Sequence, residues 1–255
     1  MKIEVLFPEI GNLYGELFNI RYLRESLENS VHLEDGSPVY DIEIIETHLN
    51  DKPLFVREMP DLIYMGTMTE NNQKLAIRKL IQYKIELKKC IDNGVNMLLT
   101  GNAVEVLGKQ IIEDDEVVAE GLGLIDIYAK RSSIDRYNSL YVGEFDPGHD
   151  EKIKVVGFKS QFGFIYGPDI DKPAFDTLLG YASNLETTCE GIRINNLIAT
   201  SVIGPLLVLN PLLTKWYMNE VFEVGFEPAY FKEAMDSYQS RVEEYLTPGK
   251  GWEYK

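Results

Sequence analysis

The spacing of apolar and polar positions along the first 110 residues alternates between two periods. Short stretches that are apolar or strictly alternating predict strands at residues 2–7, 39–46, 61–66 and 95–99. Between them, apolar residues recur at helical spacing over 16–29, and again from a predicted N-cap at Thr69 to about Asp92. This order predicts a doubly wound α/β fold with a mostly parallel sheet, whose ligands bind at the carboxyl ends of the strands.

The second half of the chain has a different pattern. Short strand-like pieces, separated by Gly, Pro and Asp turns, occur at 121–126, 139–145, 154–159 and 163–167. They predict antiparallel strands at the sheet edge. Residues 192–203 predict a last strand pair or one bent strand, followed by helices over 211–223 and 228–246 and a loose tail over 246–255. We expect a single domain over 1–255, because this length suffices for one large core.

Charge and hydropathy narrow the class of protein. The chain has 25 basic and 41 acidic residues, and its formal charge of −16 repels phosphate backbones. We therefore expect no nucleic-acid partner. No stretch reaches the ~18 uninterrupted apolar residues of a membrane helix, and the N-terminus MKIEVLFPEIG is typical of a strand rather than of a signal sequence. These features predict a cytoplasmic protein without a membrane span.

Metal and thiol chemistry have little support in the sequence. Cys90 and Cys189 lack the spacing of a metal site or a disulfide framework, and we expect inert thiols. The acidic run 113–116 lies on a predicted hairpin turn, where consecutive acids are more often solvated than bound to a cation. We expect no metal and no cofactor.

The stretch 93–109, NGVNMLLTGNAVEVLGK, is the main candidate for a functional site. It predicts an apolar strand that leads through a tight turn at 100–102 into a short helix closed by Gly108. Such a turn places its residue at the carboxyl edge of the sheet, with backbone N–H groups and the positive end of a helix dipole directed at it. A nucleophile would sit at this position, which here is Gly101.

The turn resembles the nucleophile elbow of class I glutamine amidotransferases of the cobyric-acid-synthase-like branch. Residues 101–108, GNAVEVLG, keep the length and closing Leu-Gly of the motif C-G-G-Y-Q-x-L-G. Further matches to the glutaminase subunits of lipid II isoglutaminyl synthase fall at 6–15 with 19–20, 65–73, 120–126, 157–158, and 204–207 with 210–211. This resemblance implies a flavodoxin-like class I amidotransferase domain with antiparallel edge strands.

The catalytic residues that the resemblance implies are absent from their positions. A glutaminase needs a cysteine nucleophile, a histidine base and N–H groups that hold the oxyanion. The cysteine position holds Gly101, the histidine position Ile203, and the position of a further family histidine Gln161. The chain's own histidines, at 32, 48 and 149, fall in predicted surface loops or strand ends. We therefore predict no glutaminase activity.

Residues around the elbow remain candidates for binding. They are Asn12, Tyr14, Asn19, Gly66, Thr67, Asn102 and Glu105. The first three lie in the first strand-to-helix loop, where they either shape the turn or line a ligand site. Gly66 and Thr67 stand in the loop that would complete the oxyanion hole of an active relative. Glu105 replaces the family's Gln, either as a salt-bridged helix residue or as a pocket group.

The resulting hypothesis is a non-catalytic family member that acts by binding. In the family that it resembles, the glutaminase subunit docks on a Mur-ligase-like subunit that consumes the ammonia, so such a subunit is an implied partner. A homo-oligomer with its own small-molecule site is a second possibility. The enzymatic alternative is an active or altered glutamine amidotransferase or hydrolase that supplies ammonia to a ligase in cobyric acid or cell-wall precursor amidation.

Overall fold

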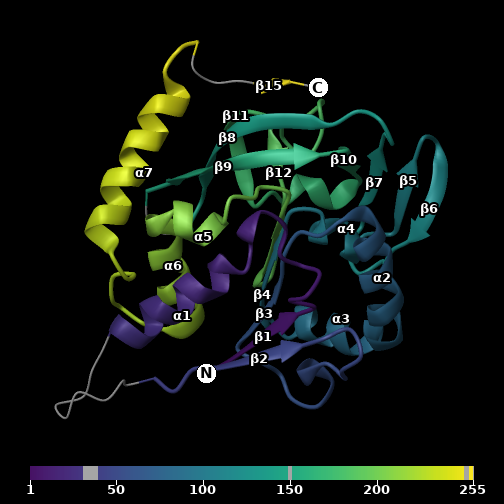
Figure 1. The fold of residues 1–255 in the computed structure, drawn as a ribbon, viewed down its shortest axis with the longest axis horizontal. Coiled ribbons are helices and arrows are strands. Elements are labelled where there is room, and N and C mark those ends of the chain that lie inside the picture. The colour runs from purple at the N-terminus through teal and green to yellow at the C-terminus, as the bar shows by residue number, and fades with distance from the viewer. Residues whose placement is uncertain (31–39, 149–150, 250–252, 255) are drawn as a thin grey trace.

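The computed structural model describes residues 1–30, 40–148, 151–249 and 253–254. Six strands form a central sheet in the order β13-β14-β4-β3-β1-β2 (Figure 1). They are β1 (Lys2–Leu6), β2 (Glu43–Thr47), β3 (Leu62–Met65), β4 (Asn96–Thr100), β13 (Ile192–Ile194) and β14 (Leu197–Thr200). All neighbouring pairs are parallel except β13 with β14. The predicted mostly parallel sheet with an antiparallel edge is confirmed.

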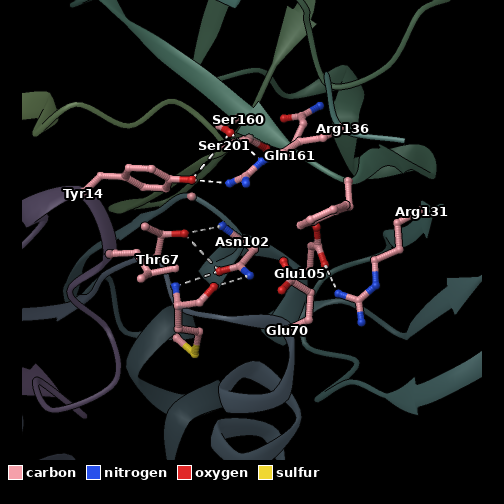
Figure 2. Close-up of a pocket in the computed structure, with 14 residues that line it drawn as sticks. Tyr14, Thr67, Glu70, Asn102, Glu105, Arg131, Arg136, Ser160, Gln161 and Ser201 are labelled. Atoms are coloured by element: carbon pink, nitrogen blue, oxygen red, sulfur yellow. Dashed lines mark hydrogen bonds and ion pairs between the residues drawn. The ribbon is translucent and has the colours of Figure 1, made fainter. Parts of the chain in front are cut away.

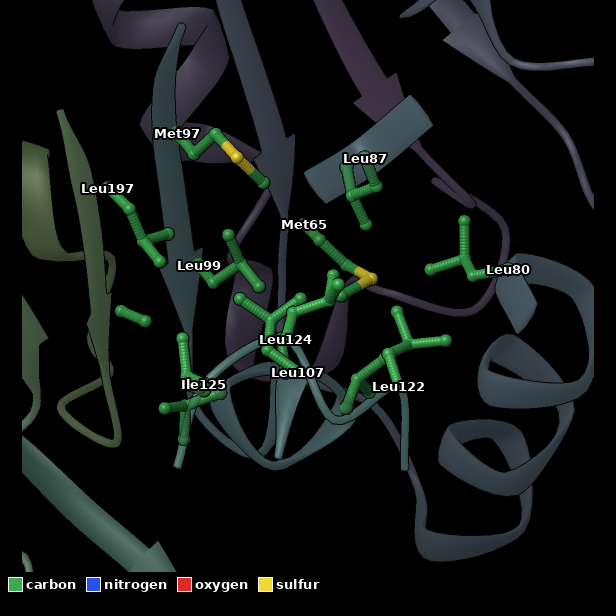
Figure 3. Packing of buried hydrophobic residues seen from close by; sticks show 14 of the residues in the cluster. Met65, Leu80, Leu87, Met97, Leu99, Leu107, Leu122, Leu124, Ile125 and Leu197 are labelled. Carbon is green, nitrogen blue, oxygen red and sulfur yellow. The ribbon is translucent and has the colours of Figure 1, made fainter. Parts of the chain in front are cut away.

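Helices cover both faces of this sheet (Figure 1). One face carries α1 (Phe18–Ser30), α5 (Leu206–Leu209) and α6 (Pro211–Phe222), and the other carries α2 (Glu70–Leu80), α3 (Lys84–Asp92) and α4 (Ala103–Leu107). Within β3, Leu62 and Tyr64 belong to one buried cluster, whereas Ile63 and Met65 belong to the other. Figure 3 shows the second cluster around Met65, Leu99 and Leu107. A strand buried on both faces explains why its sequence is continuously apolar.

The single helix predicted from Thr69 to Asp92 is wrong. Thr69 does cap α2, and its Oγ1 accepts from the Asn72 backbone N–H at 3.3 Å. However, a 3-10 turn, η3 (Ile81–Tyr83), separates α2 from α3. Ile81 and Ile85, two apolar positions of the predicted helix, are 47% and 69% exposed. The apolar positions of this stretch span more than one helix face, and packing against the sheet selects which of them are buried.

The other 3-10 turns are η1 (Leu13–Gly15), η2 (Leu54–Val56) and η4 (Pro168–Asp171).

The middle strands build two further sheets instead of extending the central one. One has the order β10-β7-β5-β6, from β5 (Gln110–Glu113), β6 (Glu116–Glu120), β7 (Tyr128–Arg131) and β10 (Gly163–Tyr166). The other has the order β12-β11-β8-β15, with β9 paired to β8, from β8 (Tyr137–Phe145), β9 (Ile153–Gln161), β11 (Phe175–Leu179), β12 (Cys189–Glu190) and β15 (Glu253–Tyr254). Residues 121–126, predicted as a strand, form a loop. Its Leu122 and Leu124 N–H groups donate to Val106 and Leu107 carbonyls at the end of α4, which replaces pairing with a strand.

The C-terminal segment lies against the third sheet (Figure 1). Helix α7 (Phe231–Leu246) packs its predicted apolar face there, and the Tyr238 hydroxyl donates to the Lys154 carbonyl at 2.8 Å. The tail predicted to be loose includes β15, whose Glu253 and Tyr254 pair with Ser139 and Asn138 of β8. An open strand edge with free backbone groups is what such a segment can pair with. No described helix has the length and apolarity needed to cross a bilayer.

Candidate functional site

The predicted strand-to-helix turn is present. β4 ends at Thr100, Gly101 has a φ of +62°, and α4 begins at Ala103. Glycine adopts such a positive φ freely, whereas other residues are strained there. In nucleophile elbows the same kind of sharp turn exposes the reactive residue at the sheet edge. The chain therefore keeps the elbow backbone although the residue at its tip has no side chain.

A pocket lies over the elbow at the carboxyl edge of the central sheet (Figure 2). It is lined by Leu13, Tyr14, Thr67, Met68, Glu70, Gly101, Asn102, Glu105, Arg131, Arg136, Ser160, Gln161, Phe162 and Ser201. The sequence candidates that meet here are Tyr14, Thr67, Gly101, Asn102, Glu105 and Gln161. Segments that are distant in the chain thus converge on one site.

The Thr67 side chain fills the space in which a nucleophile would stand. A Cβ atom on Gly101 would lie 2.2 Å from Thr67 Cβ and 2.3 Å from Thr67 Oγ1, well below van der Waals contact. It would lie 3.2 Å from Ile203 Cγ2, so the predicted base position adjoins the elbow. Ile203 is buried, and its hydrocarbon side chain cannot accept a proton. Neither a thiol nor an imidazole stands at these two positions, and the room for the thiol is occupied.

Asn102 engages the backbone groups that would form an oxyanion hole. Its own N–H points to Thr67 Oγ1 at 3.4 Å, and its Oδ1 accepts from the Met68 N–H at 3.0 Å and from the Thr67 hydroxyl at 3.1 Å. Its Nδ2 donates to the Met68 carbonyl at 2.8 Å. An oxyanion hole requires donors free to face the developing charge. In this protein the Met68 N–H already bonds to the Asn102 side chain, and the Asn102 N–H already bonds to the Thr67 side chain.

The wall formed by η1, β9 and the segment before β8 presents a guanidinium and hydroxyl groups. Arg136 Nε donates to Ser160 Oγ at 2.9 Å, and its Nη2 donates to the Tyr14 hydroxyl. The guanidinium carbon also lies 5.1 Å from the centre of the Phe162 ring, within cation–π range. Beside them, Gln161 Oε1 is buried and has no hydrogen-bond partner in the described part of the chain.

The opposite wall carries a buried chain of polar side chains that runs from Gln73 through Arg131 to Glu113. Gln73 Nε2 donates to the Asn102 carbonyl at 2.7 Å and to Glu105 Oε2 at 2.9 Å. Gln73 Oε1 accepts from Arg131 Nη1 at 3.0 Å. Arg131 Nε donates to Glu113 Oε2 at 2.8 Å, and only 3% of the Arg131 side chain is exposed. Its Nη2 has no partner among the residues that the structure describes.

Burial raises the pKa of Glu105, and the Gln73 hydrogen bond and the Arg131 charge oppose that shift. Because the pKa of Glu105 is higher in the folded state than in the unfolded state, protonation of Glu105 stabilises the folded protein. This contribution to the free energy of unfolding is lost as pH rises through the folded-state pKa. Glu105→Gln should therefore be more stable than the parent at neutral pH, with a difference that shrinks as pH falls towards about 4.5.

Urea unfolding at several pH values measures this difference, whose slope for one proton is at most about 1.4 kcal/mol per pH unit. Glu116→Gln, at the exposed first residue of β6, is the matched control. A Glu105→Gln advantage that stays constant with pH would contradict the shifted pKa.

A buried network underneath the pocket holds the elbow to neighbouring loops. Glu16 accepts from the Gly204 N–H at 2.9 Å and from Asn19 Nδ2 at 3.3 Å. The Tyr64 hydroxyl donates to the Glu16 carbonyl at 2.8 Å and lies 3.2 Å from Thr100 Oγ1. Burial raises the pKa of Glu16 despite these bonds. Asn19, a binding candidate from the sequence, is fully buried here and ties these loops together instead of lining the pocket.

Two other sequence candidates have backbone roles. Asn12 Oδ1 accepts from the Leu17 N–H at 3.0 Å, just ahead of α1. A Cβ on Gly66 would lie 2.3 Å from the Gly11 carbonyl oxygen, so only glycine permits this approach of the two loops. Neither residue lines the pocket. Both instead shape the loops that do.

The remaining candidates lie away from the site. Cys90 is buried in α3, which raises the pKa of its thiol to about 11, and Cys189 lies in β12. His48 follows β2 and contacts Glu9 at 3.2 Å, whereas residues 32 and 149 lie outside the described residues. Within the described ranges, no group of His, Cys, Asp and Glu side chains is arranged to hold a metal ion.

Sequence reasoning missed several residues of this pocket. These are Arg131, Arg136, Ser160 and Ser201, together with Gln73, which bonds to the lining residues Asn102 and Glu105. Arg131 ends β7 and Arg136 precedes β8, in a region whose strands belong to separate sheets. No local motif marks them, because their approach to the elbow depends on how those sheets pack.

The elbow, the parallel sheet and the pocket above them define a glutamine amidotransferase-like domain whose elbow lacks a nucleophile. The chain belongs to the CobB/CobQ-like glutamine amidotransferase domain family, whose sequence profile matches residues 2–208. It is 29% identical over 224 residues to the glutamine-hydrolysing lipid II isoglutaminyl synthase subunit GatD of Staphylococcus aureus strain N315. The aligned region covers 85% of this chain and 84% of the relative.

One solved structure supports the fold. PurLQS from Thermotoga maritima aligns with a TM-score of 0.51 at 13% identity, over 94% of this chain and 98% of that one. The structure of a glutamine amidotransferase aligns with a TM-score of 0.49 at 12% identity, over 86% of this chain and 98% of the other. At this identity the first of these alignments supports the α/β architecture alone.

Proposed function

We propose that this protein is a non-catalytic glutamine amidotransferase-like protein that acts by binding through its elbow face. The observation that carries the proposal is the Thr67 side chain, which stands within 2.3 Å of any Cβ placed on Gly101. The paired state of the Asn102 and Met68 N–H groups is a second support, since it removes the donors that a tetrahedral intermediate needs. Loss of the nucleophile alone already removes most of the rate acceleration that a catalytic triad provides.

Ammonia release from glutamine tests the loss of activity. We expect no turnover above buffer from the purified chain, alone or mixed with a candidate ligase subunit. An electrophilic glutamine analogue, followed by mass spectrometry, should leave no adduct, because Cys90 is buried with a raised pKa and Cys189 lies outside the pocket. Turnover or a stoichiometric adduct would overturn the proposal.

A ligase-like subunit is the partner that we favour. The Staphylococcus aureus relative is named as a subunit of a synthase, and its match extends over most of both chains. Leu13 and Tyr14 line the pocket, are 38% and 48% accessible, and offer apolar contact area. Co-purification with a Mur-ligase-like protein encoded by an adjacent gene would support this assignment. A stable homodimer in light scattering, without a ligase in the preparation, would favour the homo-oligomer instead.

A further inference from the structure

A second cavity lies at the amino ends of β4 and β14, at the edge of the central sheet opposite to the elbow. The turn between β13 and β14, the first residue of β4 and helix α6 form its walls. Its volume is about 120 Å³. An apolar cavity of about 150 Å³ holds a molecule as large as benzene, so this one has room for a small organic molecule.

Arg193 is the cationic side chain of this cavity. Its guanidinium carbon lies 4.8 Å from the centre of the Phe145 ring and 5.3 Å from that of Trp216, so two aromatic rings hold the group in place. Nη1 donates to the Asp146 carbonyl at 2.6 Å, and in the described part of the chain this is its single side-chain hydrogen bond. The guanidinium therefore keeps further donors, in a geometry that matches a carboxylate.

Acceptor groups gather on the other side of the cavity. The Nδ2 atoms of Asn96, Asn195 and Asn196 donate to backbone carbonyls at 3.0, 2.9 and 2.8 Å, which fixes the orientation of the three amides. No hydrogen bond among the described residues reaches their Oδ1 atoms. The exposed Glu220 carboxylate lines the same cavity. These oxygens together favour a ligand group that donates hydrogen bonds and carries positive charge.

The charges of the two sides act on each other. Burial lowers the pKa of Arg193, and the negative charges of Asp146 and Glu220 oppose that shift. A ligand with a single charge would meet one favourable and one unfavourable group in this cavity. A ligand with both charges at a short separation complements both.

Helix α6 adds two polar atoms that are buried and have no partner in the described ranges, Trp216 Nε1 and the Tyr217 hydroxyl oxygen. Both side chains line the cavity. Burial raises the pKa of Tyr217, so its hydroxyl stays protonated and able to donate. Native proteins carry few unpaired buried groups, because each one is costly. A carboxylate is an acceptor that can pair with such donors.

We propose that this cavity binds a small zwitterionic α-amino acid, with its carboxylate on Arg193 and its ammonium group on Glu220 and the asparagine Oδ1 atoms. The exposed Asn195 and Asn196 form the entrance. The cavity lies away from the elbow, so this inference goes beyond the proposed function and does not depend on it.

Nitrogen-15 NMR of the full chain tests the site through the indole N–H resonance of Trp216. The chain has two tryptophans, and Trp252→Phe identifies which resonance is which. Glycine and L-alanine are the probes, acetate and methylammonium chloride each supply one of the two charges, and sodium chloride controls for ionic strength. We expect a saturable shift with at least one amino acid, at concentrations at which the single-charge compounds cause none. The absence of a saturable shift with both amino acids would overturn the proposal, and so would an equal response to acetate or methylammonium.

Variants test the two charged anchors. Arg193→Gln should weaken amino-acid binding roughly tenfold or more, since charged hydrogen bonds to the carboxylate are lost. Glu220→Gln should weaken it roughly two- to fivefold, because the ion pair that it removes is exposed to solvent. Arg78→Gln, which removes an exposed arginine of α2, should bind like the parent. If Arg193→Gln does not fold, Glu220→Gln and the two single-charge compounds still decide, and parent-like affinity of Glu220→Gln would refute the ammonium site.

Discussion

Gly101→Cys is expected to lower the free energy of unfolding by about 2–6 kcal/mol and to create no glutaminase. A side chain at φ +62° is strained by about 1–3 kcal/mol, and overpacking against Thr67 adds about 1–3 kcal/mol. Activity should stay absent because Ile203 cannot act as a base. Urea unfolding and ammonia release measure the two effects.

Two further variants separate the causes of this loss. Gly148→Cys introduces a side chain at φ +90° where nothing lies within 4 Å, and it should show the backbone strain without the clash. Adding Thr67→Gly to Gly101→Cys should recover the part due to overpacking, which a double-mutant cycle isolates. If Gly101→Cys were as stable as the parent, Thr67 would be free to move aside and the site would not be filled.

Lys159→Met is expected to lower the free energy of unfolding by about 3–5 kcal/mol, because it strands a buried carboxylate. Lys159 and Glu190 are both fully buried, with Nζ 2.5 Å from Glu190 Oε2 and 2.8 Å from the Ala182 carbonyl. Glu190 Oε1 accepts from Thr200 Oγ1 and from the Ser201 N–H, each at 2.8 Å. The pair therefore supports the segment that carries Ser201 into the elbow pocket.

Thermal or urea unfolding checks this prediction against an exposed ion pair. Lys88→Met removes the partner of Asp92 on the surface of α3 and should cost less than about 1 kcal/mol. Adding Glu190→Gln to Lys159→Met should restore part of the stability, since the uncompensated charge is gone. Equal losses from Lys159→Met and Lys88→Met would contradict the buried-pair interpretation.

The binding candidates illustrate how far local sequence reaches into the site. Motif position predicted that Tyr14, Thr67, Asn102 and Glu105 stand near the elbow, and all four line the pocket. The same reasoning placed Asn19 in the loop, whereas it lies in the first turn of α1 and its side chain bonds to Glu16 and to the Leu207 N–H below the pocket. It also gave no sign that Thr67 fills the space next to Gly101.

The central sheet, its covering helices and the elbow turn were determined by the sequence itself, because apolar periodicity and turn residues act over a few neighbours. Tertiary structure alone decided the break at Ile81–Tyr83, the separate sheets of the middle strands and the pairing of β15 with β8. It also decided that Arg131 reaches the elbow pocket. These features depend on packing between segments far apart in the chain, and one sequence does not record such packing.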